Sequence, residues 1–142
     1  MYTVSVSVPF CYAHRVLGHP KCKHLHGHNG VAEVVLGCFH LPGSGMVVDF
    51  GVAKHQIKSW IDGYWDHHTI LDRRDKALIN FLSGDNTDRT PYITEQPPTA
   101  EVLAHDLYEA LKAMFTEASF RVMSVTVTET PNCSATYKEG DL

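Results

Sequence analysis

Residues 2–10 alternate between apolar and polar side chains, and this alternation constrains the fold more than any other stretch of the sequence. A period of two is typical of a β-strand with one buried face. Continuing the same parity places Tyr12 and His14 on the buried face, provided that no bulge intervenes. The sequence therefore predicts an N-terminal strand that carries a histidine at its end. The apolar positions are Tyr2, Val4, Val6, Val8 and Phe10, alternating with Thr3, Ser5, Ser7 and Pro9.

Five of the ten histidines lie in residues 13–29. His26 and His28 are separated by one glycine, so on an extended strand their imidazoles point to the same side. His14 could supply a third nitrogen across a hairpin, and three histidines without a fourth protein ligand are typical of an open, catalytic zinc site. Cys22 is the reactive group nearest to the pair in sequence. Spacing alone leaves the alternative of surface or hydrogen-bonded core histidines, and of a cysteine that is simply a small buried side chain.

Length and composition favour a soluble globular protein with a single domain over residues 1–142. The net charge is −4, and no lysine or arginine run is present, so we expect no nucleic-acid partner. No apolar stretch is long enough for a membrane span, and the N-terminus is typical of a strand and not of a signal peptide. The four cysteines form no CxxC pair, so we expect free thiols, a reducing compartment and a cytoplasmic location.

The middle of the chain changes to a helical period. Ile57, Trp60, Ile61 and Tyr64 predict a helix that begins near Asp49, which could cap its start. Residues 83–98 are polar and predict a connection. Thr99 then precedes a second helical pattern in residues 100–114 and is a good N-cap.

Three further strands are predicted, over residues 28–39, 123–129 and 134–138, which gives the order ββααββ and an antiparallel α+β domain. In the third of the four strands, Met123, Val125, Val127 and Glu129 share one face. A carboxylate on an apolar face needs a partner, because burying it unpaired is expensive. The alternative is a glutamate on an edge strand that faces water.

Six sequence blocks occur in an order that resembles the family of 6-pyruvoyltetrahydropterin and 6-carboxytetrahydropterin synthases: FCYAH, CKHLHGHN, GMVVDF, WDHH, PPTAE and TVTETPNCSATY. The resemblance covers nearly the whole chain. It implies the tunnelling fold, with a four-stranded antiparallel sheet and two helices on one face. It also implies trimers whose sheets join into a barrel, stacked as a homo-hexamer with active sites at subunit interfaces.

The same resemblance implies a role for each candidate site residue. The zinc ligands fall on His14, His26 and His28, the three residues that the spacing also indicates. Cys22 becomes the base, and its partner is the pair Asp66 and His67, which the residues alone would place on the surface. Glu129 would hold a pterin ring through two parallel hydrogen bonds. Thr99 would add a pterin contact, although N-capping alone accounts for it.

The implied function is that of a zinc-dependent lyase acting on 7,8-dihydroneopterin triphosphate. The short loop between Cys22 and the HGH pair resembles the bacterial 6-carboxy-5,6,7,8-tetrahydropterin synthases of the deazapurine and queuosine route, which release acetaldehyde and triphosphate. The alternatives are 6-pyruvoyltetrahydropterin synthase activity, a zinc- and pterin-binding protein without catalysis, and a purely structural zinc module. Cys11, Tyr12 and Gly30 depart from the family pattern and could reshape the pocket. Candidate partners for the triphosphate are Arg15, Lys21, Lys23, Arg73 and Arg74.

Overall fold

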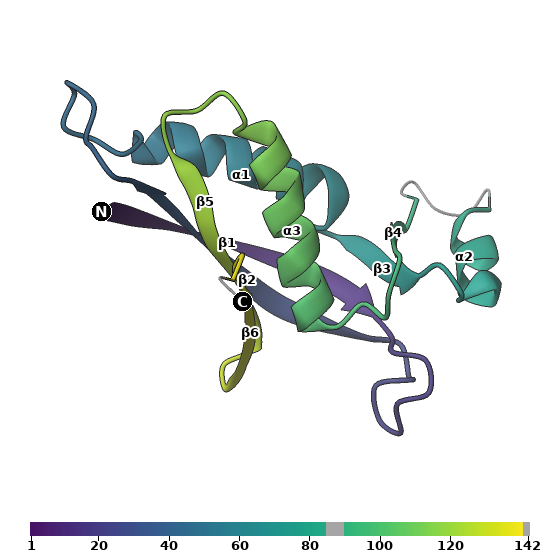
Figure 1. Cartoon of the computed structure of the whole chain (residues 1–142). Helices are drawn as coiled ribbons and strands as arrows, with labels where there is room; N and C mark the ends of the chain where they lie inside the picture. The colour runs from purple at the N-terminus through teal and green to yellow at the C-terminus, as the bar shows by residue number, and fades with distance from the viewer. Residues whose placement is uncertain (85–89, 141–142) are drawn as a thin grey trace.

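A curled β-sheet with helices packed along one face is the main feature of the structure, a computed structural model that describes residues 1–84 and 90–140 (Figure 1). The strands lie in the order β4-β3-β1-β2-β5-β6. β3 runs parallel to both β1 and β4, and the other neighbouring strands are antiparallel. The elements in chain order are β1 (Tyr2–His14), β2 (His26–Cys38), α1 (Phe50–Tyr64), β3 (His68–Asp72), α2 (Lys76–Leu82), β4 (Tyr92–Thr94), α3 (Ala100–Met114), β5 (Arg121–Thr130) and β6 (Cys133–Tyr137).

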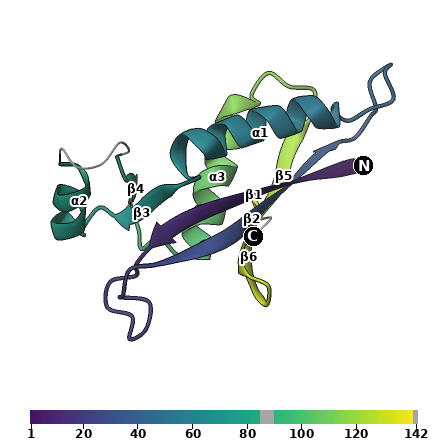
Figure 2. The ribbon, with the colours of Figure 1, turned by 180° about the vertical axis from the view of Figure 1, so that it is seen from behind.

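The long hairpin of β1 and β2 forms the centre of the sheet. Its register runs without interruption from Tyr2 opposite Cys38 to His14 opposite His26. Val8, Phe10 and Tyr12 are buried, which confirms the predicted alternation through to His14. The loop of residues 15–25 extends from the end of the hairpin opposite to the N-terminus (Figure 2).

The core lies between the sheet and the helices α1 and α3. Ile57, Ile61, Leu103 and Leu107 are fully buried and belong to the same cluster as the inward residues of β1, β2 and β5. Both predicted N-caps are confirmed: the Asp49 carboxylate accepts a hydrogen bond from the Val52 N–H, and the Thr99 hydroxyl accepts one from Val102. Among the described residues, no helix has the length and apolar character needed to cross a membrane.

The prediction of four antiparallel strands and two helices is wrong in its counts, because the described residues form six strands and three helices. The additional elements are β3, α2 and β4, and each is too short to show a clear hydrophobic period. β3 begins within the WDHH block and pairs in parallel with the end of β1. β4 lies inside the polar segment 83–98, which was predicted as a connection. Residues 85–89 of that segment lie outside the described part of the chain.

β5 contains a bulge opposite β2, so the predicted parity is wrong at Met123. Val122 lies opposite Leu36, and Ser124 lies opposite Val35, which leaves Met123 without a residue facing it on β2. Val122 is therefore buried where Met123 was expected. The parity holds again beyond the bulge, where Val125 and Val127 are fully buried.

Candidate metal centre

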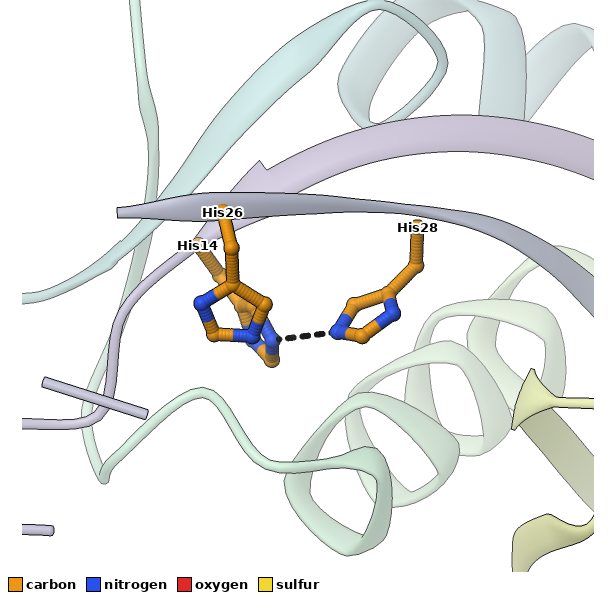
Figure 3. Close-up of side chains that lie close together, drawn as sticks. All are labelled: His14, His26 and His28. Atoms are coloured by element: carbon orange, nitrogen blue, oxygen red, sulfur yellow. Dashed lines mark hydrogen bonds between the residues drawn. The ribbon is translucent and has the colours of Figure 1, made fainter. Parts of the chain in front are cut away.

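Three histidines meet where β1 ends and β2 begins (Figure 3). His14 lies opposite His26 in the hairpin, and His28 lies opposite Tyr12, so all three rings project from the same face. One ligand nitrogen from each ring lies within 4.8 Å of the other two. The Nε2 atoms of His14 and His28 are 3.1 Å apart. Two nitrogens bound to one tetrahedral zinc ion would be separated by roughly 3.3 Å. The predicted cluster is therefore present and has the dimensions of a metal site.

Main-chain carbonyls orient two of these rings. His14 Nδ1 lies 2.7 Å from the Pro98 carbonyl oxygen, and His26 Nδ1 lies 2.6 Å from the His24 carbonyl oxygen. A carbonyl oxygen only accepts hydrogen bonds, so each Nδ1 carries the ring hydrogen. The lone pair of each Nε2 is therefore free to bind a metal ion. Burial lowers the pKa of His14 and also that of His28, which favours the neutral rings that bind metal. The three side chains thus fit a zinc ion.

Glu129 extends from β5 to the same point. Its Oε1 lies 3.1 Å from His14 Nε2, 3.2 Å from His28 Nε2 and 3.4 Å from the Tyr12 hydroxyl. The strand parity placed Glu129 on this face, but nothing in the sequence indicated that its carboxylate would reach the imidazoles. Glu129 is therefore a candidate for a fourth protein ligand, which the sequence did not indicate.

A cavity of about 230 Å³ adjoins the histidines and brings together four of the predicted site residues: His14, Cys22, Thr99 and Glu129. Two hydrogen bonds hold the main chain of Cys22 in its loop. The Val16 N–H donates to the Cys22 carbonyl (2.7 Å), and the Cys22 N–H donates to His19 Nδ1 (2.9 Å). His19, which the sequence did not single out, is thus a structural part of this loop. The cavity also contains the exposed Glu101 and Cys133, at the start of α3 and β6.

Asp66 and His67 form the predicted pair, but on another side of the sheet. Asp66 Oδ2 lies 2.9 Å from His67 Nδ1, and Asp66 Oδ1 accepts the Cys11 N–H at 2.9 Å. Burial raises the pKa of Asp66, but the hydrogen bonds from Cys11 and His67, together with the nearby charges of His67 and Lys58, lower the pKa below its ordinary value. His67 has a φ of 58°, an uncommon conformation for a residue other than glycine, and its N–H donates to the Cys11 carbonyl.

His67 lines a different cavity, of about 440 Å³, together with Cys11, Ala13 and Asn29, and parts of Tyr12 and His28 also border it. Cys11 and Ala13 alternate along β1 with Tyr12 and His14, so they face the opposite side of the strand from the metal cluster. Cys22 is not among the residues that line this second cavity. Within one chain, Cys22 and His67 therefore line different cavities.

Three comparisons with known proteins agree with one another. Residues 3–140 match the family described as 6-pyruvoyl tetrahydropterin synthase. A 6-carboxy-5,6,7,8-tetrahydropterin synthase from Rickettsia bellii is 33% identical over 127 residues, which span 89% of this chain and 92% of the relative. An uncharacterized protein from Wolinella succinogenes has a similar structure, with a TM-score of 0.82, 27% identity and 98% coverage of both chains. The 6-pyruvoyl tetrahydropterin synthase of Caenorhabditis elegans has a TM-score of 0.70 and 28% identity, over 98% of this chain and 96% of its own.

Proposed function

The chain belongs to the 6-pyruvoyl tetrahydropterin synthase family, and from this premise we propose that it is a zinc-dependent lyase acting on 7,8-dihydroneopterin triphosphate. The product proposed is 6-carboxy-5,6,7,8-tetrahydropterin, with release of acetaldehyde and triphosphate, as a step toward deazapurines such as queuosine. The observation that carries the proposal is the set of three metal-facing imidazole nitrogens beside a cavity that also contains Cys22. The names of relatives such as the Rickettsia bellii protein support the carboxy product.

Each predicted residue has a proposed role in this reaction. His14, His26 and His28 would hold the zinc ion, which would polarise a substrate oxygen and favour proton loss from the neighbouring carbon. Cys22 would take that proton, since its loop places it in the cavity beside His14. A thiol acts as a base only when its surroundings favour the thiolate, and a nearby metal cation does so.

The Asp66–His67 pair would act on a substrate bound to a neighbouring subunit. The pair faces away from the histidine cluster of its own chain. It could therefore meet a Cys22 side chain only if two copies of the chain contribute to one site. We therefore propose a homo-hexamer, built as a dimer of trimers, with active sites at the subunit interfaces. The Asp66 carboxylate would orient the His67 ring and stabilise its charged form while the ring moves a proton.

Glu129 and Thr99 would bind the pterin ring, because both line the cavity that contains Cys22. A carboxylate can accept two parallel hydrogen bonds from the ring N–H and the exocyclic amino group.

The set of basic residues that could bind the triphosphate can be reduced. Arg15, Arg73 and Arg74 form ion pairs with Asp75, Glu95 and Asp72 respectively. Because these arginines already have carboxylate partners, we favour Lys21 and Lys23, the two lysines of the Cys22 loop, as the residues that bind the triphosphate.

The experiment that tests the proposal is incubation of the zinc-loaded protein with 7,8-dihydroneopterin triphosphate, followed by mass spectrometry of the products. The carboxy product with acetaldehyde and triphosphate would support the proposal. The pyruvoyl product is the alternative, favoured by the likeness to the Caenorhabditis elegans protein. Bound but unchanged substrate would indicate a zinc- and pterin-binding protein without catalysis.

A further inference from the structure

Three donor atoms at the metal centre form an almost equilateral triangle. The edges are 3.1 Å between His14 Nε2 and His28 Nε2, 3.1 Å between His14 Nε2 and Glu129 Oε1, and 3.2 Å between His28 Nε2 and Glu129 Oε1. Nitrogen and oxygen donors that share one tetrahedral zinc ion would lie roughly 3.3 Å apart. Each edge is therefore close to the separation expected for ligands of a common ion.

A hydrogen bond accounts for only part of the triangle, since a hydrogen on His28 Nε2 can serve the edges to His14 Nε2 and Glu129 Oε1 but not the edge between His14 and Glu129. The hydrogen of a neutral His14 ring lies on Nδ1, which faces the Pro98 carbonyl. Its Nε2 then presents a lone pair to a carboxylate oxygen, and two lone pairs at this distance repel each other unless a cation lies between them. A metal ion shared by the three atoms would account for all three edges at once.

We propose that Glu129 is a fourth, exchangeable ligand of the metal while no substrate is bound. The inference rests on the zinc and pterin binding proposed above. It adds that the Glu129 carboxylate has two states, one bound to the metal and one bound to the pterin ring. With substrate bound, a substrate oxygen would replace the Glu129 carboxylate on the metal, and the freed carboxylate would accept the hydrogen bonds of the pterin ring. The exchange requires no electron transfer, because one oxygen ligand replaces another.

Tyr12 holds the carboxylate in the metal-bound position. Its hydroxyl lies 3.4 Å from Glu129 Oε1, and its buried ring stacks on Phe10 with the centroids 5.1 Å apart. The ring also meets the edges of His14 and His28. A hydrogen bond to a metal-bound carboxylate is a common way of orienting a ligand.

The first test measures metal binding by the metal-free protein with Co²⁺ and Zn²⁺. Glu129→Gln should weaken zinc binding at least about tenfold and change the visible spectrum of the cobalt protein, because one ligand is lost. Glu101→Gln is the matched control, since this carboxylate lines the same cavity but is exposed. The control should keep the zinc affinity and the cobalt spectrum of the unsubstituted protein.

The second test uses unsubstituted pterin, which has no side-chain oxygen to offer the metal. Unsubstituted pterin can bind Glu129 only by removing the carboxylate from zinc. By linkage, the zinc-loaded protein should therefore bind unsubstituted pterin at least about tenfold more weakly than the metal-free protein does. The difference should vanish in Glu129→Gln.

The outcomes separate this inference from the proposed function. Zinc uptake and product formation by the unsubstituted protein, with unchanged zinc affinity and cobalt spectrum in Glu129→Gln, would overturn the fourth-ligand role alone. Equal pterin affinity with and without zinc would overturn the exchange. Failure of the unsubstituted protein to bind any metal would overturn both this inference and the proposed function.

Discussion

At the scale of single residues, the three histidines differ in how they are held, and this allows a controlled test of the metal centre. Replacing His26 or His28 with alanine removes one of three imidazole donors, so zinc content after purification should fall to roughly a tenth of the unsubstituted level or less. His24→Ala is the control, because the hydrogen bond from His26 is accepted by the main-chain carbonyl of His24, which alanine retains. Elemental analysis provides the measurement, and full zinc retention in both His26→Ala and His28→Ala would disprove the assignment of the ligands.

Cys22 should be needed for turnover and not for metal binding. Cys22→Ala removes the proposed base, so the rate should fall by a factor on the order of 10² or more while zinc content and thermal stability stay unchanged. Cys133→Ala is a suitable control, since Cys133 is a free thiol that lines the same cavity. Rate and zinc content should be measured on the same sample. A parallel loss of zinc in Cys22→Ala would instead identify the thiol as a ligand.

Glu129 should determine the affinity for the pterin ring. In Glu129→Gln the charge is lost and one acceptor becomes a donor, which would face a donor of the ring. Binding of 7,8-dihydroneopterin, followed by fluorescence at saturating zinc, should weaken by at least about tenfold, since hydrogen bonds to charged groups contribute roughly 1.5–3 kcal/mol each. Unchanged affinity would mean that this carboxylate does not contact the pterin.

Sequence reasoning was most successful for residues whose position follows from strand parity. His14 and Glu129 lie on the predicted faces, because alternation along a strand is set by the backbone alone. The contact between Glu129 and the histidines could not be predicted in this way, since it depends on the pairing of β5 with β2 and on how far a side chain extends. For Asp66 and His67 the residues alone gave only a surface position, and His67 is indeed exposed.

At the scale of elements, the hairpin of β1 and β2 is packed around a glycine. A Cβ atom at Gly30 would lie 3.1 Å from Tyr12 Cε1 and 3.3 Å from the Phe10 ring. Both rings are buried, and Phe10 also packs on Trp65, so neither can move aside easily. Two of the three positions that depart from the family pattern, Tyr12 and Gly30, therefore lie together, and the Tyr12 ring occupies the space that a side chain at Gly30 would need.

Gly30→Ala should consequently lower the free energy of unfolding by about 1 kcal/mol or more, as expected for overpacking of a core. Gly43→Ala makes the same chemical change in a loop where a Cβ would meet nothing within 4 Å, and it should be nearly neutral. Urea denaturation of the two variants provides the comparison. Equal stability of Gly30→Ala and the unsubstituted protein would show that the aromatic pair yields to the methyl group.

The elements that the sequence did not predict are those that depend on tertiary context. β3 and β4 have five and three residues, and they become strands only because β1 offers an edge to β3 and β3 offers one to β4. α2 has seven residues, and its start is fixed by Asp75, which also forms an ion pair with Arg15 at the end of β1. The bulge at Met123 is likewise invisible in a sequence that alternates regularly. The long strands and the helices α1 and α3 were predictable, because their hydrophobic periods extend over several turns or residue pairs.

At the scale of the whole molecule, the described sheet ends in two edge strands, β4 and β6. An edge strand exposes unpaired main-chain groups, which a ring of subunits would cover. Two separate cavities border the β1–β2 hairpin, one lined by Cys22 and the other by His67. If copies of the chain join at these edges, the unpaired edge strands are covered. Cys22 of one chain can then meet His67 of its neighbour at the same interface.

This arrangement predicts complementation between two inactive proteins. Cys22→Ala and His67→Ala should each lose turnover, but in oligomers refolded from an equal mixture some sites will combine an intact Cys22 from one chain with an intact His67 from its neighbour. With random assembly in a closed ring, about a quarter of the sites should be intact, and the rate should recover in proportion. A mixture of Cys22→Ala with the double variant Cys22→Ala/His67→Ala is the control, because it contains no intact Cys22. Mixed oligomers that remain as inactive as their parents would show that Cys22 and His67 of one chain serve the same site.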